Sequence, residues 1–354
     1  MPIERGREPN PMQPRLITKC LLLFCFAGAL TPLAHSTSCT TNAQMAPEQR
    51  NALLDATRSL VGAVQHNDMQ TLRAKTLAAS AEDANGIVMS AQAMSALIQS
   101  ATITVDALYE LDGSTGQANA QRTQFFCGSP TVVLTFDGLP QGTYALSIVH
   151  ATGVSKPQLI SLILAKAAGN TWQLAGFYGK PMLEDGHDGL WYWKSARQYA
   201  QARKNWGAWF YYRIAASLLD PLDSLSSPNL EKLQHETEQV RPSDVPGPSP
   251  VVLNGNTASF HVTGIDMTTE FGALDIDLHY TPDPSQAEQL RTPVAARQQV
   301  TNLMAALLTQ HPELRDAFHG IWVHADRENA SIYALELPMN EIAAGQSPQP
   351  GTIR

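Results

Sequence analysis

The stretch Ala84–Leu111, ANGIVMSAQAMSALIQSATITVDALYEL, contains the change of pattern that decides the fold class. From Ala84 to Ser100, apolar residues recur at three- and four-residue steps, as they do on one face of an α-helix. From Ile103 to Leu111, β-branched and apolar residues alternate with polar ones, which is typical of a strand with one buried face. A helix is therefore predicted to lead directly into a sheet.

The segments on either side of this stretch extend the same order. Two amphipathic helices are predicted before it, at 47–67 and 69–79. Further strands are predicted after it, at 130–136, 144–150, 159–165 and 172–178, with turn sequences such as Asp112-Gly113 between them. Helices followed by antiparallel strands predict an α+β domain over residues 45–182, in which the sheet curls and the helices close one face.

This order of elements over residues 45–180 resembles the cone-shaped fold shared by ketosteroid isomerases, SnoaL-type polyketide cyclases and nuclear transport factor two. The resemblance implies a concave sheet face that binds small apolar molecules, where a buried acid, tyrosine or histidine can transfer protons. The side chains on or beside these strands are Asp106, Tyr109, Asp137, Tyr144 and His150. Of these, Asp106, Tyr109 and His150 are the candidate catalytic residues, although the acids and histidines of the enzyme families do not match them residue by residue.

The first 36 residues have the pattern of a signal peptide. Four basic residues precede an unbroken apolar run from Cys20 to Leu30, and Ala34-His35-Ser36 offers a small-residue cleavage site. Removal of four basic and two acidic residues changes the net charge from −8 to −8 − (+2) = −10. The mature chain is therefore expected to be acidic and periplasmic or secreted, with no later transmembrane segment and no nucleic-acid partner.

Two cysteines, Cys39 and Cys127, remain after this cleavage. In an oxidising compartment they are predicted to form a disulfide bond. The alternative is lipid attachment at Cys39, but Ser36-Thr37-Ser38 lacks the leucine that lipoprotein signals usually carry three positions before the cysteine.

Residues 190–219 are predicted to form two antiparallel helices within a unit at 188–240. Ala196, Tyr199, Ala208, Tyr212 and Ala215 lie at offsets of 3, 12, 16 and 19. This spacing resembles a single tetratricopeptide repeat over residues 190–222, in which small residues let the two helices approach closely. One such repeat cannot bury its own apolar face, so the hairpin is expected to pack on a neighbouring domain or on a partner.

The hairpin is also rich in aromatic residues, and two interpretations are open for them. They form an aromatic core between domains, or Trp191, Trp206 and Trp209 form an exposed binding surface. Around Gly176–Pro181 and through these helices, the chain is similar to uncharacterised secreted bacterial proteins, a similarity that implies no activity.

A stiff, proline-rich linker is predicted at 241–250 and a ββαββ domain at 251–342. Its parts are a hairpin at 258–265 and 273–280, a helix at 293–310 and a second hairpin at 320–325 and 330–337. Residues 343–354, rich in Gly, Pro and Gln, are expected to be a disordered tail.

A candidate metal site lies on the first of these hairpins. Asp275, Asp277 and His279 alternate along a strand and so share one face of it. If the hairpin turns at 267–271, His261 joins them near Asp277, and two imidazoles with two carboxylates can bind a transition metal. The alternative is a solvated face, and His324 with Asp326 is likewise expected at the surface.

A second acidic segment, Glu184–Gly189, contains three carboxylates and an imidazole. It can hold a cation, or Asp188 can cap the helix that starts near Leu190.

The sequence contains no G-x-S-x-G, H-E-x-x-H, Walker or Cys-x-x-Cys motif, and no cofactor is expected. We therefore predict a non-catalytic binding or assembly module of the cell envelope that recognises a protein or a small apolar ligand. The alternatives are a cavity enzyme of the isomerase or cyclase type and a non-catalytic scaffold.

Overall fold

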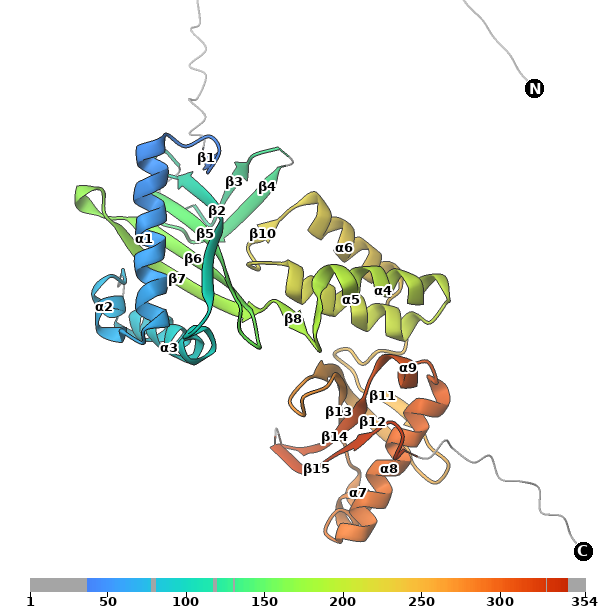
Figure 1. Cartoon of the computed structure of the whole chain (residues 1–354). Coiled ribbons are helices and arrows are strands. Elements are labelled where there is room, and N and C mark those ends of the chain that lie inside the picture. The colour runs from blue at the N-terminus through green and yellow to red at the C-terminus, as the bar shows by residue number, and fades with distance from the viewer. Residues whose placement is uncertain (1–36, 78–80, 117–119, 130, 329, 343–354) are drawn as a thin grey trace, which may run out of the picture. The chain divides into compact units, whose positions relative to one another are not determined.

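A computed structural model shows an α+β protein (Figure 1), as the sequence predicts. It describes residues 37–77, 81–116, 120–129, 131–328 and 330–342, with the side chains of 81–83 left out. The expected signal peptide at 1–36 and the expected tail at 343–354 lie outside these residues. Within the part described, no helix combines the length and apolarity needed to cross a lipid bilayer.

Three helices open the chain, as predicted: α1 (Pro47–Gln65), α2 (Met69–Ala74) and α3 (Ala81–Ile98). Pro47 suits the first turn of α1, where its missing N–H is not needed. The side chain of Asp68 caps α2 by accepting a hydrogen bond of 3.0 Å from the backbone N–H of Thr71. These local signals fix where the helices begin.

Five antiparallel strands follow the order β1-β2-β5-β6-β7 in the first sheet. Their bounds are β1 (Ser38–Thr41), β2 (Thr102–Asp112), β5 (Thr143–Thr152), β6 (Gln158–Lys166) and β7 (Trp172–Pro181). Helices α1 to α3 cover one face of this sheet (Figure 1), where Val149 and Leu162 are fully buried.

A second, three-stranded sheet packs on the opposite face of the first. It has the order β10-β4-β3, with β10 (Leu225–Ser226), β4 (Val132–Asp137) and β3 (Arg122–Cys127). Phe125 and Leu134 of this sheet belong to the same apolar cluster as Leu146 and Ile148 of β5. Both faces of the first sheet are therefore covered, although the sequence predicts helices on one face only.

The predicted disulfide pair, Cys39 and Cys127, is present in the structure with its Cα atoms 5.1 Å apart. Cys39 lies on β1 of the first sheet and Cys127 ends β3 of the second. The bond therefore connects the two sheets across the apolar cluster between them.

The helical hairpin is formed by α4 (Gly189–Gln201) and α5 (Asn205–Leu219), which α6 (Pro228–Gln239) follows. The Asp188 side chain caps α4 by accepting a 2.7 Å hydrogen bond from the backbone N–H of Trp191, which confirms the capping interpretation of the acidic segment. Between Leu183 and Asp188 that segment forms the short ribbon of β8 (Leu183–Glu184) and β9 (His187–Asp188).

The hairpin does not bury its apolar face alone. One apolar cluster joins Phe210 and Tyr211 of α5 to Phe318 and to the sheet that follows. Hydrogen bonds support this packing, since the Tyr211 hydroxyl donates to the backbone oxygen of Ala317 at 2.9 Å. The expected docking on a neighbouring part of the chain is thus observed.

The C-terminal sheet has five strands in the order β11-β12-β13-β14-β15. Its elements are β11 (Val251–Asn254), β12 (Ser259–Thr268), β13 (Asp275–Thr281), α7 (Pro284–Gln289), α8 (Pro293–Gln310), α9 (Leu314–Ala317), β14 (Gly320–Arg327) and β15 (Ala330–Pro338). Strands β13 and β14 are parallel, so the two predicted hairpins merge into one sheet and the helices form the crossover between them. Strand β11 has no counterpart in the predicted ββαββ module.

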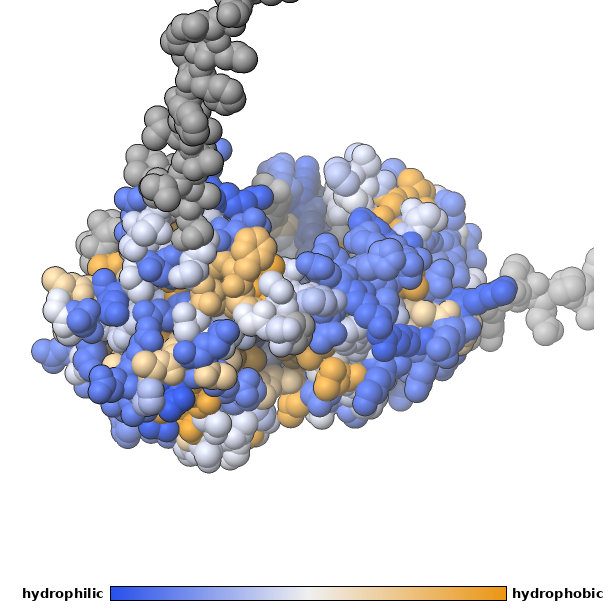
Figure 2. Space-filling model, turned by 90° about the horizontal axis from the view of Figure 1, so that it is seen from above, coloured by the Kyte–Doolittle hydropathy of each residue, from blue (hydrophilic) through white to orange (hydrophobic). Residues whose placement is uncertain are grey.

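The surface seen in Figure 2 is mostly hydrophilic, with smaller hydrophobic patches between the polar side chains. The large apolar side chains with the highest exposure include Val294, Met89 and Phe126, at 81%, 69% and 61%. They lie on α8, α3 and β3, three different elements of the fold.

A glutamate on α6 should make the stability of the protein depend on pH. The Arg197 guanidinium on α4 donates to both carboxylate oxygens of Glu236 at 2.7 and 2.8 Å, and Trp193 Nε1 donates at 2.7 Å. Hydrogen bonding from Arg197, followed by that from Trp193, lowers the pKa of Glu236 below its usual 4.5. The stabilisation is therefore present above pH 4.5 and is lost as the pH falls through the lowered value.

We expect Glu236→Gln to reduce the free energy of unfolding by about 1 kcal/mol at pH 7, and we expect this difference to vanish towards pH 3. Urea denaturation across this pH range measures the difference. The control is Glu238→Gln, because the ion pair of Glu238 with Arg241 is long, at 4.0 Å, and the Glu238 side chain is 60% exposed. An effect of Glu236→Gln that is equal at pH 3 and pH 7 would contradict the assignment.

Candidate metal centre

The side of strand β13 that faces away from the apolar core carries a row of titratable residues. Asp275, Asp277 and His279 share this face because side chains alternate along a strand. The opposite face is fully buried against the core and consists of Ile276, Leu278 and Tyr280. Parallel pairing with β14 places His279 beside His324, which adds a second imidazole to the row.

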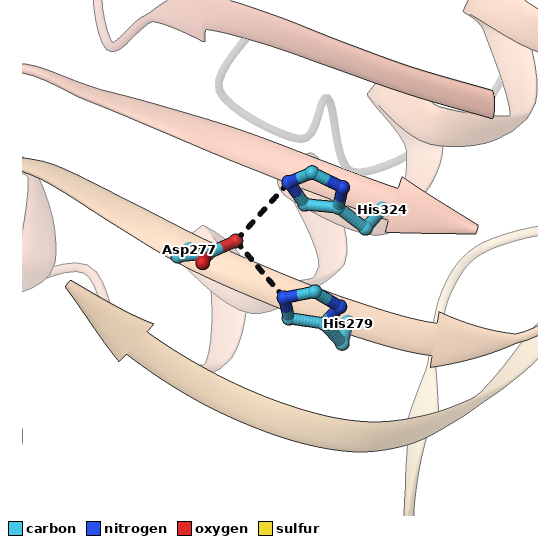
Figure 3. A group of neighbouring side chains, drawn as sticks. All are labelled: Asp277, His279 and His324. Carbon is cyan, nitrogen blue, oxygen red and sulfur yellow. Dashed lines mark ion pairs between the residues drawn. The ribbon is translucent and has the colours of Figure 1, made fainter. Parts of the chain in front are cut away.

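Three side chains converge at the middle of this sheet face (Figure 3). The Nε2 atom of His279 lies 3.2 Å from Oδ1 of Asp277, and the Nε2 atom of His324 lies 3.3 Å from the same oxygen. The two imidazole rings stack on each other with their centroids 4.5 Å apart. The Nε2 atoms of both histidines therefore lie against the same carboxylate oxygen.

The other ring nitrogen of each histidine is held from outside this group. His279 Nδ1 lies 2.6 Å from Oδ2 of Asp326, and His324 Nδ1 lies 3.3 Å from the hydroxyl oxygen of Ser331. That hydroxyl donates its own hydrogen to the backbone oxygen of Tyr333 at 3.2 Å, so its oxygen is left to accept from His324 Nδ1–H. Ser331 therefore favours the tautomer of His324 whose Nε2 carries a lone pair.

Without a bound cation, the contact between His324 and Asp277 is electrostatically unfavourable. His324 Nε2 is a buried polar atom with no hydrogen-bond partner among the residues described, whereas the buried Asp277 Oδ1 forms an ion pair of 3.2 Å with His279 Nε2. Burial lowers the pKa of His324 below its usual value, which keeps its ring neutral at pH 7. In the tautomer that Ser331 favours, a lone pair on His324 Nε2 faces a carboxylate oxygen 3.3 Å away, and a cation bound between the two atoms would relieve their repulsion.

His279 is in the opposite electrostatic situation. The neighbouring Asp277 carboxylate, and then Asp326, raise its pKa to about 9, although burial acts against them. In the absence of a metal the ring is therefore an imidazolium ion at pH 7. A metal ion at this position would displace its Nε2 proton, as metal binding to histidine generally does.

An aromatic edge borders the group on one side. The Trp322 ring lies 4.0 Å from the His324 ring, and Phe271 contacts Trp322 edge to face at 5.0 Å. Phe271 is itself 49% exposed. The His324 side chain is only 11% exposed, while His279 remains 35% exposed and gives the group access to solvent.

The structure corrects one member of the predicted metal set. His261 pairs with Thr281 across β12 and β13, and the residue opposite Asp277 is Asp266. The turn between the strands lies at 269–274, further along the chain than the predicted 267–271, so His261 is displaced along the strand from Asp277.

His324, expected at the surface, instead belongs to the group, and Asp326 contacts His279 from outside it. The signal that could have located them is the alternation of Trp322, His324 and Asp326 along β14, but only with the knowledge that β13 and β14 are adjacent and parallel. Asp275 lies at the other end of β13 and belongs to a separate group with His319 and Glu336.

The candidate catalytic residues of the N-terminal domain do not come together. Asp106 is exposed beside a bulge in β2, and Tyr109 and His150 lie on the sheet face that the second sheet covers. Tyr109 pairs with Leu146, four residues from His150 along β5, which is a separation of roughly 13 Å.

The other two residues of this predicted set also serve the fold. Asp137 forms an exposed ion pair of 3.0 Å with Arg122, and the buried Tyr144 donates its hydroxyl hydrogen to the backbone oxygen of Pro140. A cavity of about 680 Å³ does occur in this part of the chain, but the residues that line it are not in the predicted set. They include Met94, Phe177 and Lys180.

The three tryptophans Trp191, Trp206 and Trp209 do not form the exposed binding surface that one interpretation of the sequence predicts. Trp206 and Trp209 are buried, with 5% and 7% of their surface exposed, because α5 packs in the apolar core. Trp191 is 39% exposed and stacks on His187 at 3.6 Å. The aromatic residues of the hairpin therefore follow the core interpretation.

No protein-family model matches the chain, and no curated protein or solved structure is found similar to it.

Proposed function

We propose that this chain is an exported binding protein whose ligand is a transition-metal ion of the zinc class, held by Asp277, His279 and His324. The observation that carries the proposal is the convergence of Asp277 Oδ1 with the Nε2 atoms of both histidines, each of which is oriented through its other ring nitrogen. Export and an acidic mature chain remain part of the proposal, as expected from residues 1–36.

The distances support a small divalent ion. Metal–nitrogen and metal–oxygen bonds of about 2.0 to 2.2 Å in a tetrahedral site place two ligand atoms about 3.3 Å apart. The two distances from Asp277 Oδ1, 3.2 and 3.3 Å, match this spacing before any ion is bound. Calcium prefers six to eight oxygen ligands at 2.3 to 2.6 Å, so two imidazoles and one carboxylate favour zinc, nickel or copper instead.

The outer contacts support the same proposal. A histidine that binds metal almost always donates its other ring N–H to a carboxylate, a carbonyl or water. Asp326 and Ser331 supply such partners here. A solvated polar face, the alternative suggested by the sequence, gives no reason for two histidines to be held with their Nε2 atoms on one carboxylate oxygen.

Three protein ligands leave at least one position of a tetrahedral ion for water or for a small anion. We place binding ahead of catalysis because Asp106, Tyr109 and His150, the candidate residues of the isomerase-type alternative, do not come together.

The test uses the chain from residue 37 onward, freed of metal with EDTA. Addition of Co²⁺ should give one equivalent of tightly bound ion with the visible absorption of low-coordinate cobalt, and Zn²⁺ should displace it. His324→Gln should weaken Zn²⁺ binding by more than about 100-fold, since even the loss of an outer partner costs about 10- to 100-fold.

The matched control is His261→Gln. His261 lies on the adjacent strand and was in the predicted set, but it is exposed and outside the group. It should leave Zn²⁺ affinity unchanged. Equal affinities of the His324→Gln and His261→Gln variants, or the absence of a visible cobalt spectrum, would overturn the proposal.

A further inference from the structure

A second group of ligand-type side chains lies at the other end of the same sheet face. Asp275 begins β13, His319 immediately precedes β14, and Glu336 lies on β15. One ligand atom of each lies within 4.8 Å of the other two. None of these residues belongs to the Asp277 group, so an argument about them does not depend on that site.

The absence of a side chain at Gly320 makes this convergence possible. Gly320 of β14 lies beside Asp275 in the sheet, with β15 on its other side. A Cβ atom at position 320 would lie 2.7 Å from Oε1 of Glu336 and 2.8 Å from Oδ1 of Asp275. The two carboxylates therefore occupy space that any side chain at position 320 would fill.

One oxygen of each carboxylate is left without a partner among the residues described. Asp275 has no exposed surface, and its Oδ2 atom and Oε1 of Glu336 are buried without a hydrogen-bond partner among the residues described. A buried carboxylate pair of this kind needs either a bound proton or a cation.

The remaining charges around the group also favour a cation. The negative charge of Asp185, in the ribbon of β8 and β9, repels that of Asp275. The negative charge of Glu341 likewise repels that of Glu336. Against these stands His319, whose Nδ1 lies 3.0 Å from Oδ1 of Asp275. The His319 side chain is 50% exposed, so an ion can reach the group from solvent.

We propose that Asp275, His319 and Glu336 form a second, separate site for a divalent cation, with the oxygen-rich preference of Mn²⁺. Two carboxylates and one imidazole are a harder donor set than that of Asp277, His279 and His324, so the two groups should differ in the ion that they prefer. The C-terminal sheet then presents two cation sites along one face, which lie two residues, or about 7 Å, apart on β13.

The test measures Mn²⁺ binding to the chain from residue 37 onward by electron paramagnetic resonance, since bound Mn²⁺ loses the sharp signal of the free ion. The protein first receives a single equivalent of Zn²⁺, which occupies the Asp277 group if that group binds and leaves the second group free. One equivalent of Mn²⁺ should bind, and Glu336→Gln and His319→Gln should each weaken it by more than about 10-fold.

Two controls separate a defined site from general acidity and from misfolding. Glu341→Gln removes a nearby exposed carboxylate and should leave Mn²⁺ binding almost unchanged. Glu336→Gln removes like-charge repulsion, so its metal-free melting temperature should not fall below that of the parent. His319 is half exposed, so its replacement should also leave the fold intact.

The outcomes are distinct from those of the Asp277 site. Retention of Mn²⁺ by both Glu336→Gln and His319→Gln, or its loss on His279→Gln alone, would overturn the second site and leave the first untouched. The absence of Mn²⁺ binding, together with a higher melting temperature for Glu336→Gln, would show that the two carboxyl groups share a proton instead. Loss of Zn²⁺ binding with retained Mn²⁺ binding would reject the proposed function alone.

Discussion

Replacement of both Cys39 and Cys127 with alanine should reduce the free energy of unfolding of the oxidised protein by about 2 to 5 kcal/mol. The bond joins residues 88 positions apart, and a crosslink of that span removes much of the freedom of the unfolded chain. It also connects the two sheets of the N-terminal domain, and Cys127 has no exposed surface. Urea denaturation followed by far-ultraviolet circular dichroism measures the loss.

The single variants provide the control for this prediction. Because the bond needs both sulfurs, Cys39→Ala alone should remove most of the stability that the double variant loses. A reducing agent should destabilise the parent protein by a similar amount and leave the double variant unaffected. Stability that is insensitive both to the reductant and to Cys39→Ala would show that the bond does not form in solution.

The sequence predicts most of the N-terminal helices and long strands because their apolar residues repeat clearly. It does not predict β1 or β3. Strand β1, Ser38–Thr41, has only four residues, and its partner β2 lies more than sixty residues away along the chain. The periodicity of a segment shows that it has a buried face, but not which distant segment covers that face.

The metal site shows the same limit. The alternation of Asp275, Asp277 and His279 along one strand is visible in the sequence and is confirmed as one face of β13. The fourth predicted ligand, His261, is wrong because it lies opposite Thr281. The second histidine of the site is His324, which lies on a strand that follows a helical crossover. Local spacing identifies ligands on one strand, but ligands from different strands depend on the pairing of the whole sheet.

The aromatic residues of the hairpin show why composition does not separate a core from a binding surface. Tryptophan has a large apolar ring and one N–H group, so either place suits it if that group finds an acceptor. Here Trp206 donates to Asp244 at 3.1 Å, which lets its ring be buried. The linker residue Asp244 supplies this acceptor, and nothing in the local sequence of α5 predicts that contact.

Enlargement of the small residues between the hairpin helices should have the second large effect. Ala196 on α4 and Ala208 on α5 have no exposed surface, as expected from their spacing. The structure adds a further close contact, since a Cβ atom on Gly207 would lie 3.2 Å from the ring of Tyr199. The backbones of α4 and α5 are therefore close along this part of the hairpin.

Ala196→Leu and Ala208→Leu should each reduce the free energy of unfolding by about 1 to 3 kcal/mol, because the extra atoms of leucine force the packed helices apart. Gln201→Leu places the same leucine side chain at an exposed position at the end of α4 and should stay within about 0.5 kcal/mol of the parent. Urea denaturation of the three variants compares them directly. Since α5 shares its core with the C-terminal sheet, the two alanine variants should also lower the affinity of that sheet for Zn²⁺ if the packing of the hairpin holds the sheet in place. Equal denaturation midpoints for all three variants would mean that these alanines do not set the distance between the helices.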